Sequence, residues 1–137
     1  MQEAYRQATY AFAEGEIPIG AVVVSNNRII AKAYNQTEKL NDVTAHAEML
    51  ALTAAAEYLG NKYLNDCTLF VTVEPCVMCA GASYWAQLKR VVYGTSEPKH
   101  GYRRVGSLLH PKTEMVSGVM AQECAELMAT FFAAKRK

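Results

Sequence analysis

The chain has 137 residues, a length that fits one domain with a buried core. Hydrophobic residues make up 51% and charged residues 20%, an ordinary globular composition without an apolar run near the roughly 18 residues that a membrane-spanning helix needs. The formal net charge of +1 hides an asymmetry, because residues 1–68 carry an acidic excess and residues 69–137 a basic one.

The first half of the chain predicts a helix, a pair of strands and a second helix. Alanines recur at helical spacing near the N-terminus, and Gly15 with Pro18 ends that helix. Residues 19–24 (I-G-A-V-V-V) and 28–34 (R-I-I-A-K-A-Y) have strand composition, and the short S-N-N between them suits a hairpin, so this pair is expected to be antiparallel. A polar stretch follows, and the next helical pattern runs from about residue 45 to 59.

The second half predicts two parallel strands, a basic loop, a short strand and a final helix. Residues 68–73 (T-L-F-V-T-V) form a buried strand, Pro75 opens the next helix, and residues 90–93 form a strand that ends before Gly94. Strand, short helix and strand in this order imply a parallel, right-handed crossover. A last strand is expected near residues 114–117. The apolar stripe of the final helix consists of Cys124, Leu127, Met128 and Phe131. We therefore expect a single three-layer α/β domain over residues 1–137, with a mixed sheet of about five strands.

Two short motifs carry the chemistry, H-A-E at residues 46–48 and P-C-V-M-C at residues 75–79. Each stands at the start of a predicted helix, where unpaired N–H groups and the helix dipole lower the pKa of a thiol. Cys76 and Cys79 are three positions apart, so both sulfurs face the same side of a helical turn. With His46 as a third ligand, they predict three corners of a tetrahedral zinc site.

Glu48 is expected to move protons rather than to bind the metal. It lies two positions after His46, roughly 200° around an ideal helix, so it should not reach the same ion from the same face. It can instead stand beside an open fourth position that holds water, the arrangement of a catalytic zinc. Two thiolates leave the zinc site formally neutral and weakly acidifying, and a carboxylate that takes the proton of the water makes up part of that deficit.

The C-x-x-C pair alone also fits a redox pair or half of a structural zinc site. A structural site needs a fourth ligand, but the extended strand after Cys67 holds that residue roughly 20 Å or more from Cys76. Cys67 and Cys124 are expected to be small buried side chains, and His100 and His110 to be surface residues. A redox pair would leave the H-A-E motif unexplained, so the two motifs together favour the catalytic zinc site.

Basic side chains of the second half gather at residues 89–90, 99–104 and 135–137. Such a stripe can meet phosphates, and a solvated surface is the plain alternative. The first residues, M-Q-E-A-Y-R-Q, lack a basic region followed by an apolar stretch, so we expect no secretory signal and a cytoplasmic protein. A C-x-x-C pair is also more typical of metal or redox chemistry inside a cell than of export.

The pair of motifs H-x-E and P-C-x-x-C resembles the zinc nucleobase deaminases, and the likeness extends over nearly the whole chain. The blocks E-I-P-I-G-A-V-V-V, T-A-H-A-E-M-L-A-L, L-F-V-T-V-E-P-C-V-M-C-A-G-A, R-V-V-Y-G and G-V-M-A-Q-E-C-A-E-L-M are similar to those of bacterial tRNA-specific adenosine deaminases. The resemblance implies the cytidine-deaminase fold, one Zn²⁺ per subunit and a homodimer. It also implies hydrolysis of adenosine to inosine at the wobble position of a tRNA anticodon stem-loop.

The resemblance also implies roles for individual residues. By motif match, the zinc ligands are His46, Cys76 and Cys79, and the proton shuttle is Glu48. Asn35 matches an asparagine that contacts the flipped nucleoside, with turn capping as the plain alternative. Ile17 would line the base pocket, unless it only packs in the core. Phosphates would lie along the loop that bears Lys99, Arg103 and Arg104, and against the basic tail.

Departures from the family pattern keep other functions open. After the cysteine motif the chain reads S-Y-W-A-Q-L, and Y-W-A at this point is also found in guanine deaminases of the same fold. A free-base deaminase is therefore the alternative function. The loop E-P-K-H-G-Y-R-R-V-G-S-L keeps only Lys99, Gly101, Gly106 and Ser107 of the better known D-x-K-x-G-A-x-G-S. A non-catalytic, zinc-stabilised RNA-binding subunit is a third hypothesis, but it would have no need of Glu48.

Overall fold

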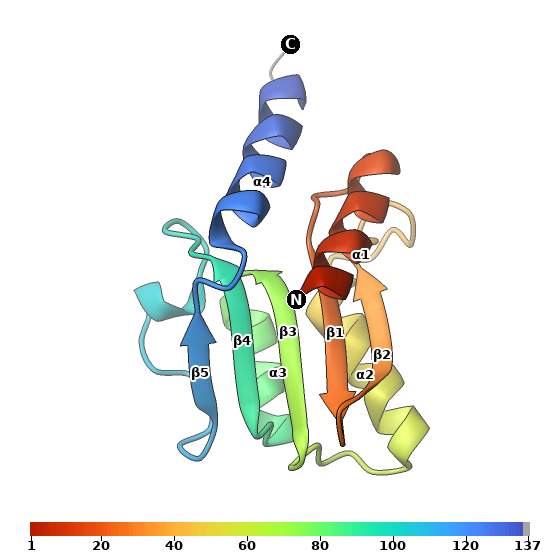
Figure 1. Cartoon of the computed structure of the whole chain (residues 1–137), viewed down its shortest axis with the longest axis vertical. Helices are drawn as coiled ribbons and strands as arrows, with labels where there is room; N and C mark the ends of the chain where they lie inside the picture. Colours follow the sequence, from red (N-terminus) through yellow and green to blue (C-terminus); the bar gives the residue numbers. More distant parts are fainter. Residues whose placement is uncertain (136–137) are drawn as a thin grey trace.

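The computed structural model describes residues 1–135, in which four α-helices pack against one five-stranded sheet. In chain order the elements are α1 (Gln2–Ala13), β1 (Gly20–Ser25), β2 (Arg28–Tyr34), α2 (Ala47–Leu59), β3 (Cys67–Val73), α3 (Val77–Ala86), β4 (Arg90–Thr95), the 3₁₀ turn η1 (Tyr102–Arg104), β5 (Glu114–Ser117) and α4 (Ala121–Lys135). Helices α1 and α4 lie on one face of the sheet, and α2 and α3 lie on the other (Figure 1). The expected three-layer α/β arrangement is confirmed.

The sheet is mixed, as expected, with the strand order β2-β1-β3-β4-β5. Strand β1 pairs antiparallel with β2 and with β3, whereas β3–β4 and β4–β5 are parallel. The β1–β2 hairpin turns at Asn26 and Asn27, which have φ values of 52° and 60°. Two positive φ values in a two-residue turn match the twist of a hairpin, which explains why asparagines stand there. The predicted antiparallel pair and parallel crossover are both confirmed.

The core lies mainly between the sheet and the α2–α3 layer. Strand β3 is almost continuously apolar because both of its faces are covered, and Leu69 and Val71 are fully buried. On the other face, α1 presses closely against β1. A Cβ atom at Gly20 would collide with the backbone of Ala4, so glycine permits this close approach. The segment that joins α1 to β1 is thereby held at the same end of the sheet as the starts of α2 and α3.

Both central helices begin later than the sequence pattern predicts. Helix α2 begins at Ala47 rather than near residue 45, and α3 begins at Val77, so that Pro75 precedes the helix instead of opening it. The residues in between, His46 and Cys76, have extended backbones with ψ values of 151° and 175° and act as N-caps. A residue whose ψ is extended cannot belong to a helix, so both helices begin only after these caps.

One further boundary was wrong in the basic second half. Strand β4 runs through Gly94 to Thr95, because a glycine can lie against the carbonyl of Thr72 where a Cβ atom would clash. The predicted loop after β4 contains one short 3₁₀ turn, η1, at Tyr102–Arg104. The strand expected at residues 114–117 is confirmed as an exposed edge strand.

None of the helices within residues 1–135 is long and apolar enough to cross a bilayer. Of the basic tail, Lys135 ends α4 with its ammonium group 5.5 Å from the ring centre of Phe131. The predicted phosphate contacts of Arg136 and Lys137 lie outside the described residues.

Candidate active site

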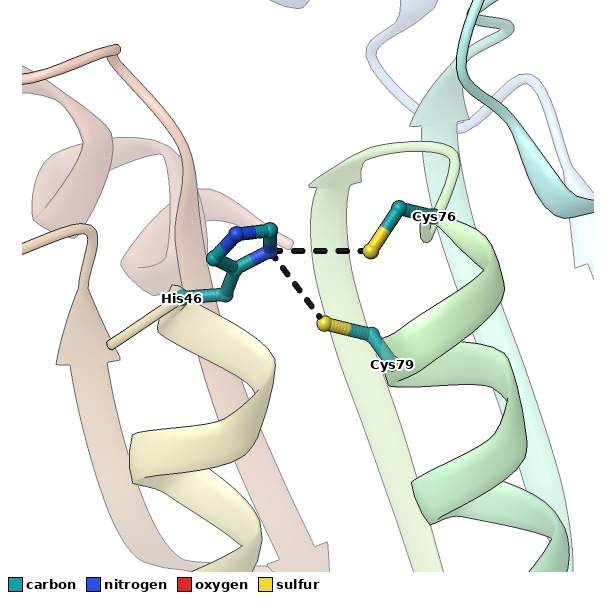
Figure 2. Close-up of side chains that lie close together, drawn as sticks. All are labelled: His46, Cys76 and Cys79. Atoms are coloured by element: carbon teal, nitrogen blue, oxygen red, sulfur yellow. Dashed lines mark hydrogen bonds between the residues drawn. The ribbon is translucent and has the colours of Figure 1, made fainter. Parts of the chain in front are cut away.

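The predicted metal ligands lie where α2 and α3 begin, at the end of the sheet where β3 terminates (Figure 1). His46 and Cys76 are the N-caps of their helices, and Cys79 is one turn into α3. Neither cap makes the side-chain hydrogen bond that a Ser, Thr, Asp or Asn cap normally gives to its helix. Their side chains are therefore free to point across the gap between the two helices, as Figure 2 shows.

The three donor atoms have the spacing of a zinc tetrahedron. Nδ1 of His46 lies 3.6 Å from Sγ of Cys76 and 3.5 Å from Sγ of Cys79 (Figure 2). Zinc bonds of about 2.3 Å to sulfur and about 2.05 Å to nitrogen, opened at the tetrahedral angle, place those atoms about 3.6 Å apart. All three ligand atoms lie within 4.8 Å of one another. The donor set fits Zn²⁺ with three protein ligands.

The ionisation of the two thiols shows why this site calls for a cation. A hydrogen bond from Cys79, followed by one from His46, lowers the pKa of Cys76 to about 4 despite its partial burial. The same pairing with Cys76, together with burial, raises the pKa of Cys79 far above its ordinary value. Two adjacent sulfurs cannot both carry charge without a counter-ion, so Cys79 keeps its proton until a metal displaces it.

Glu48 lies in the first turn of α2 and is only 3% exposed. Burial raises the pKa of its carboxyl group to about 7. Its Oε1 atom has no hydrogen-bond partner among residues 1–135. An unpaired, buried carboxylate oxygen is costly in a folded protein, and such costs are typical of functional sites. The free oxygen therefore fits a group that waits for a substrate or for the water of an open metal position.

Glu48 and the ligands His46 and Cys76 line a cavity of about 600 Å³. That volume lies within the range of small-ligand pockets and can accommodate a nucleoside. The remaining lining residues come from five parts of the chain: Ile17, Ile19, Asn35, Thr37, Glu38, Asn41, Asp42, Val43, Val73, Glu74, Glu97, His100, Met128 and Phe132. Two of the three metal ligands, His46 and Cys76, and the unpaired carboxylate of Glu48 thus face one cavity.

The first 95 residues match the family model of the cytidine and deoxycytidylate deaminase zinc-binding region. The chain belongs to this deaminase family. It is 42% identical to the tRNA-specific adenosine deaminase of Rickettsia bellii (strain RML369-C), and the match covers 96% of this chain and 97% of that relative. The family's zinc-binding region contains His46, Cys76 and Cys79, so the site holds one Zn²⁺.

Two solved structures of deaminases are also similar to this chain. One, from a study of A-to-I editing by tRNA:A34 deaminases at the wobble position of transfer RNA, has a TM-score of 0.86 at 40% identity and covers 93% of this chain and 96% of that chain. The guanine deaminase of Bacillus subtilis has a TM-score of 0.66 at 42% identity, but covers 69% of this chain and 61% of that chain. The adenosine-deaminase likeness is therefore the more complete of the two.

Asn35 and Ile17 both line the cavity beside the metal ligands. The backbone N–H of Ala47 donates a hydrogen bond of 2.9 Å to Oδ1 of Asn35, which is 3% exposed. Asn35 thus caps the start of α2, between the ligand His46 and Glu48. The earlier alternative was that Asn35 caps a turn, whereas the structure shows it capping this helix at the edge of the cavity. Ile17 is 37% exposed, so it lines the cavity rather than the closed core.

Lys99 and Arg103 are not among the described residues that line this cavity. Arg103 instead lines a separate cavity with Tyr102 and His110, and its Nη1 donates a 3.0 Å hydrogen bond to the hydroxyl of Tyr93. Its neighbour in the loop, His100, which was expected to be a plain surface residue, is exposed and also lies at the rim of the zinc cavity.

Sequence reasoning missed the wall that α4 contributes. Met128 and Phe132 line the cavity, although the sequence pattern assigned Met128 to a core stripe. A helix stripe that faces a pocket has the same spacing as one that faces the core, so periodicity could not separate them. The available signal was the pair Phe131-Phe132, since adjacent positions on a helix cannot both face the core; Phe131 is buried and Phe132 is 38% exposed.

The alternative of a structural zinc site finds no support in the geometry of the described residues. Cys67 begins β3 and is buried in the hydrophobic core, while Cys76 follows the far end of that strand. The metal-binding group among the described residues has three members, so a fourth protein ligand for a structural zinc is missing there. Cys124 is buried on α4, as expected.

Proposed function

We propose that this chain, acting as one deaminase domain over residues 1–137, hydrolyses adenosine to inosine at the wobble position of a tRNA anticodon stem-loop. The observation that supports it best is that three zinc donors lie at tetrahedral spacing, and that two of them, His46 and Cys76, share one cavity with the unpaired carboxylate of Glu48. The near full-length likeness to tRNA-specific adenosine deaminases supports the substrate.

When bound, Zn²⁺ supplies Lewis acidity that lowers the pKa of a water in its open position. Glu48 accepts a proton from the attacking water at its free Oε1 atom. As the new C–O bond forms at C6 of the adenine, the protonated carboxyl group delivers that proton to the ring nitrogen N1. Glu48 then takes the remaining proton from the hydroxyl group on C6 and delivers it to the exocyclic amine, so that the C6–N bond breaks as the C6=O bond forms, and ammonia leaves. A carboxyl pKa of about 7 lets Glu48 both accept and release a proton near neutral pH.

The cavity walls suit a base that has left its stack. Oδ1 of Asn35 is occupied by Ala47, so the amide NH₂ of Asn35 remains to donate to the nucleoside. Ile17 offers an apolar surface to the base. An anticodon loop presents its bases unpaired, so extrusion costs little there. The exposed Lys99 and Arg103 stand on the loop beside the cavity rim, where RNA phosphates would pass.

The substrate is tested with an anticodon stem-loop that carries adenosine at the wobble position. We expect inosine to form in this RNA, with no product from the same loop carrying guanosine there and no turnover of free guanine. Nucleoside analysis by mass spectrometry measures each product. Turnover of free guanine without any reaction of the RNA would contradict the proposal.

Guanine deamination is the second candidate, because of the likeness to the Bacillus subtilis enzyme and the Y-W-A sequence at residues 84–86. Tyr84 and Trp85 lie on the outer side of α3, and Trp85 is 73% exposed. Neither residue lines the zinc cavity in the described part of the chain. The presence of the same Y-W-A sequence in guanine deaminases is therefore no direct argument about which base the pocket accepts.

We also propose that the chain forms a homodimer through the outer side of α3 and acts in the cytoplasm, where tRNA is found. Val77, Tyr84 and Trp85 are exposed and share one stripe of the helix, and Gly81 between them leaves open space. An exposed apolar stripe of this kind marks an interaction surface.

Trp85→Arg should turn the dimer into a monomer, because a charge would replace the largest apolar side chain of the α3 stripe. Sedimentation velocity measures the change as a halved mass. Tyr58→Arg is the matched control, since Tyr58 is 65% exposed but lies on α2. A wild-type chain that sediments as a monomer at micromolar concentration would rule out this interface.

A further inference from the structure

Two carboxylates other than Glu48 are buried without a cation, and one of them, Glu74, also lines the zinc cavity. Glu16 is 2% exposed and Glu74 is 7% exposed, and neither takes part in an ion pair among residues 1–135. Burying a carboxylate is costly unless hydrogen bonds satisfy its oxygens. Both carboxylates are satisfied in the same way, because each accepts hydrogen bonds from backbone N–H groups of a loop that is distant in sequence.

Glu74 holds the loop of residues 96–104. Its Oε1 accepts a 3.1 Å hydrogen bond from the N–H of Glu97, and its Oε2 accepts a 3.0 Å bond from the N–H of Arg103. The loop wraps the carboxylate so closely that a Cβ atom at Gly101 would overlap it. The N–H of Tyr102 completes the attachment with a 2.8 Å bond to the carbonyl of Pro75, next to a zinc ligand.

Glu16 holds a different loop, residues 36–45, in the same way. Its Oε1 accepts a 3.1 Å hydrogen bond from the N–H of Glu38, and its Oε2 accepts a 2.7 Å bond from the N–H of Lys39. The hydroxyl of Thr37 lies 3.4 Å from Oε1. Each carboxylate therefore uses both oxygens, and each binds two N–H groups of one loop.

Both loops supply residues to the lining of the zinc cavity. The 36–45 loop supplies Thr37, Glu38, Asn41, Asp42 and Val43 to its lining, and the 96–104 loop supplies Glu97 and His100. We propose that Glu16 and Glu74 are positioning residues that fix these two walls, so that substrate affinity depends on both carboxylates although neither holds the zinc or moves a proton.

Replacement of each glutamate by glutamine tests the proposal with almost no change of shape. The amide offers one acceptor and one donor where two acceptors are needed, so one bond is lost and an NH₂ group faces a backbone N–H. In Glu74→Gln we expect trypsin to cleave after Lys99, Arg103 or Arg104 at least about 10-fold faster, through more frequent local opening. In Glu16→Gln the same gain is expected after Lys39 instead.

The reciprocal pattern is decisive because a merely destabilised fold would open both loops together. Glu114→Gln is the matched control: Glu114 is an exposed carboxylate paired with Arg90, and its loss should accelerate neither cleavage. Mass spectrometry of the first tryptic products on the folded zinc enzyme identifies each site. Equal acceleration at both loops in either variant, or acceleration at neither, would overturn the proposal.

The kinetic part rests on the proposed function. On the anticodon stem-loop, each glutamine variant should raise KM about 10-fold, with kcat within about twofold of wild type and full zinc content. A fall in kcat at unchanged KM, or a loss of zinc, would overturn the positioning role. If the wild-type chain deaminates no stem-loop, the proposed function fails, while the tryptic pattern still decides whether the two carboxylates hold their loops.

Discussion

The variant Glu48→Gln is expected to bind zinc normally and to lose deamination by at least about 10²- to 10⁴-fold in kcat, the usual contribution of a general acid–base group. The reason is geometric, because the buried Oε1 atom of Glu48 is the free proton acceptor on the cavity beside the ligands. A glutamine fills the same volume but can neither accept a proton nor return one. Inosine formation in the stem-loop and zinc content by elemental analysis measure the two halves of the prediction.

The loss must also be separated from unfolding. Removing a buried, unpaired carboxylate relieves a desolvation cost, so the melting temperature of Glu48→Gln should be at or above that of the wild-type chain. Glu57→Gln is the matched control, because Glu57 lies on the same helix but is exposed, and it should keep full activity. A Glu48→Gln protein that deaminates at the wild-type rate would remove Glu48 from the mechanism.

Removal of zinc by a chelator is expected to lower the melting temperature by about 10 °C or more, and to abolish activity until zinc is restored. The ion ties the start of α2 to the start of α3, because His46 stands at one of these helix starts and Cys76 and Cys79 at the other. Scanning calorimetry with and without chelator measures the shift. Cys79→Ser should behave like the chelated protein and Cys124→Ala should keep its zinc, since Cys124 lies on α4. An unchanged melting temperature would show that the metal contributes nothing to the fold.

Zinc uptake should also be coupled to proton release. Because the pKa of Cys79 is raised by its pairing with Cys76, Cys79 carries a proton at neutral pH in the metal-free site. Zinc must displace that proton and, where His46 is still protonated because its hydrogen bond with Cys76 raises its pKa, a second one, so the zinc affinity should rise at least about tenfold for each pH unit through the neutral range. Calorimetric titrations in buffers of different ionisation enthalpy count the proton directly.

Local patterns were sufficient to predict most of the fold. The alternation of strand and helix signals gave the element order, the asparagine turn gave the antiparallel hairpin, and the strand–helix–strand spacing gave the parallel crossover; all three are confirmed. The errors lie at boundaries such as His46 and Cys76, where an apolar or small-residue pattern continues past the point at which ψ becomes extended. Backbone dihedrals at caps respond to tertiary contacts, which periodicity does not encode.

The candidate site, like the fold, could be predicted only in part. Its metal ligands were predictable because the chemistry of zinc demands particular residue types at close spacing. The walls were not, because Phe132 and the carboxylates Glu16 and Glu74 act through contacts between segments far apart in sequence. Arg103 was predictable as a basic residue of the loop, but its hydrogen bond to the hydroxyl of Tyr93 on β4 was not.

The placement of α4 has a consequence for biosynthesis. The chain emerges from the ribosome N-terminus first, so His46, Cys76 and Cys79 are all translated before Met128 and Phe132 exist. A nascent chain therefore contains all three metal ligands before the α4 wall of the pocket has been made. The cavity is complete only after the final helix has been translated.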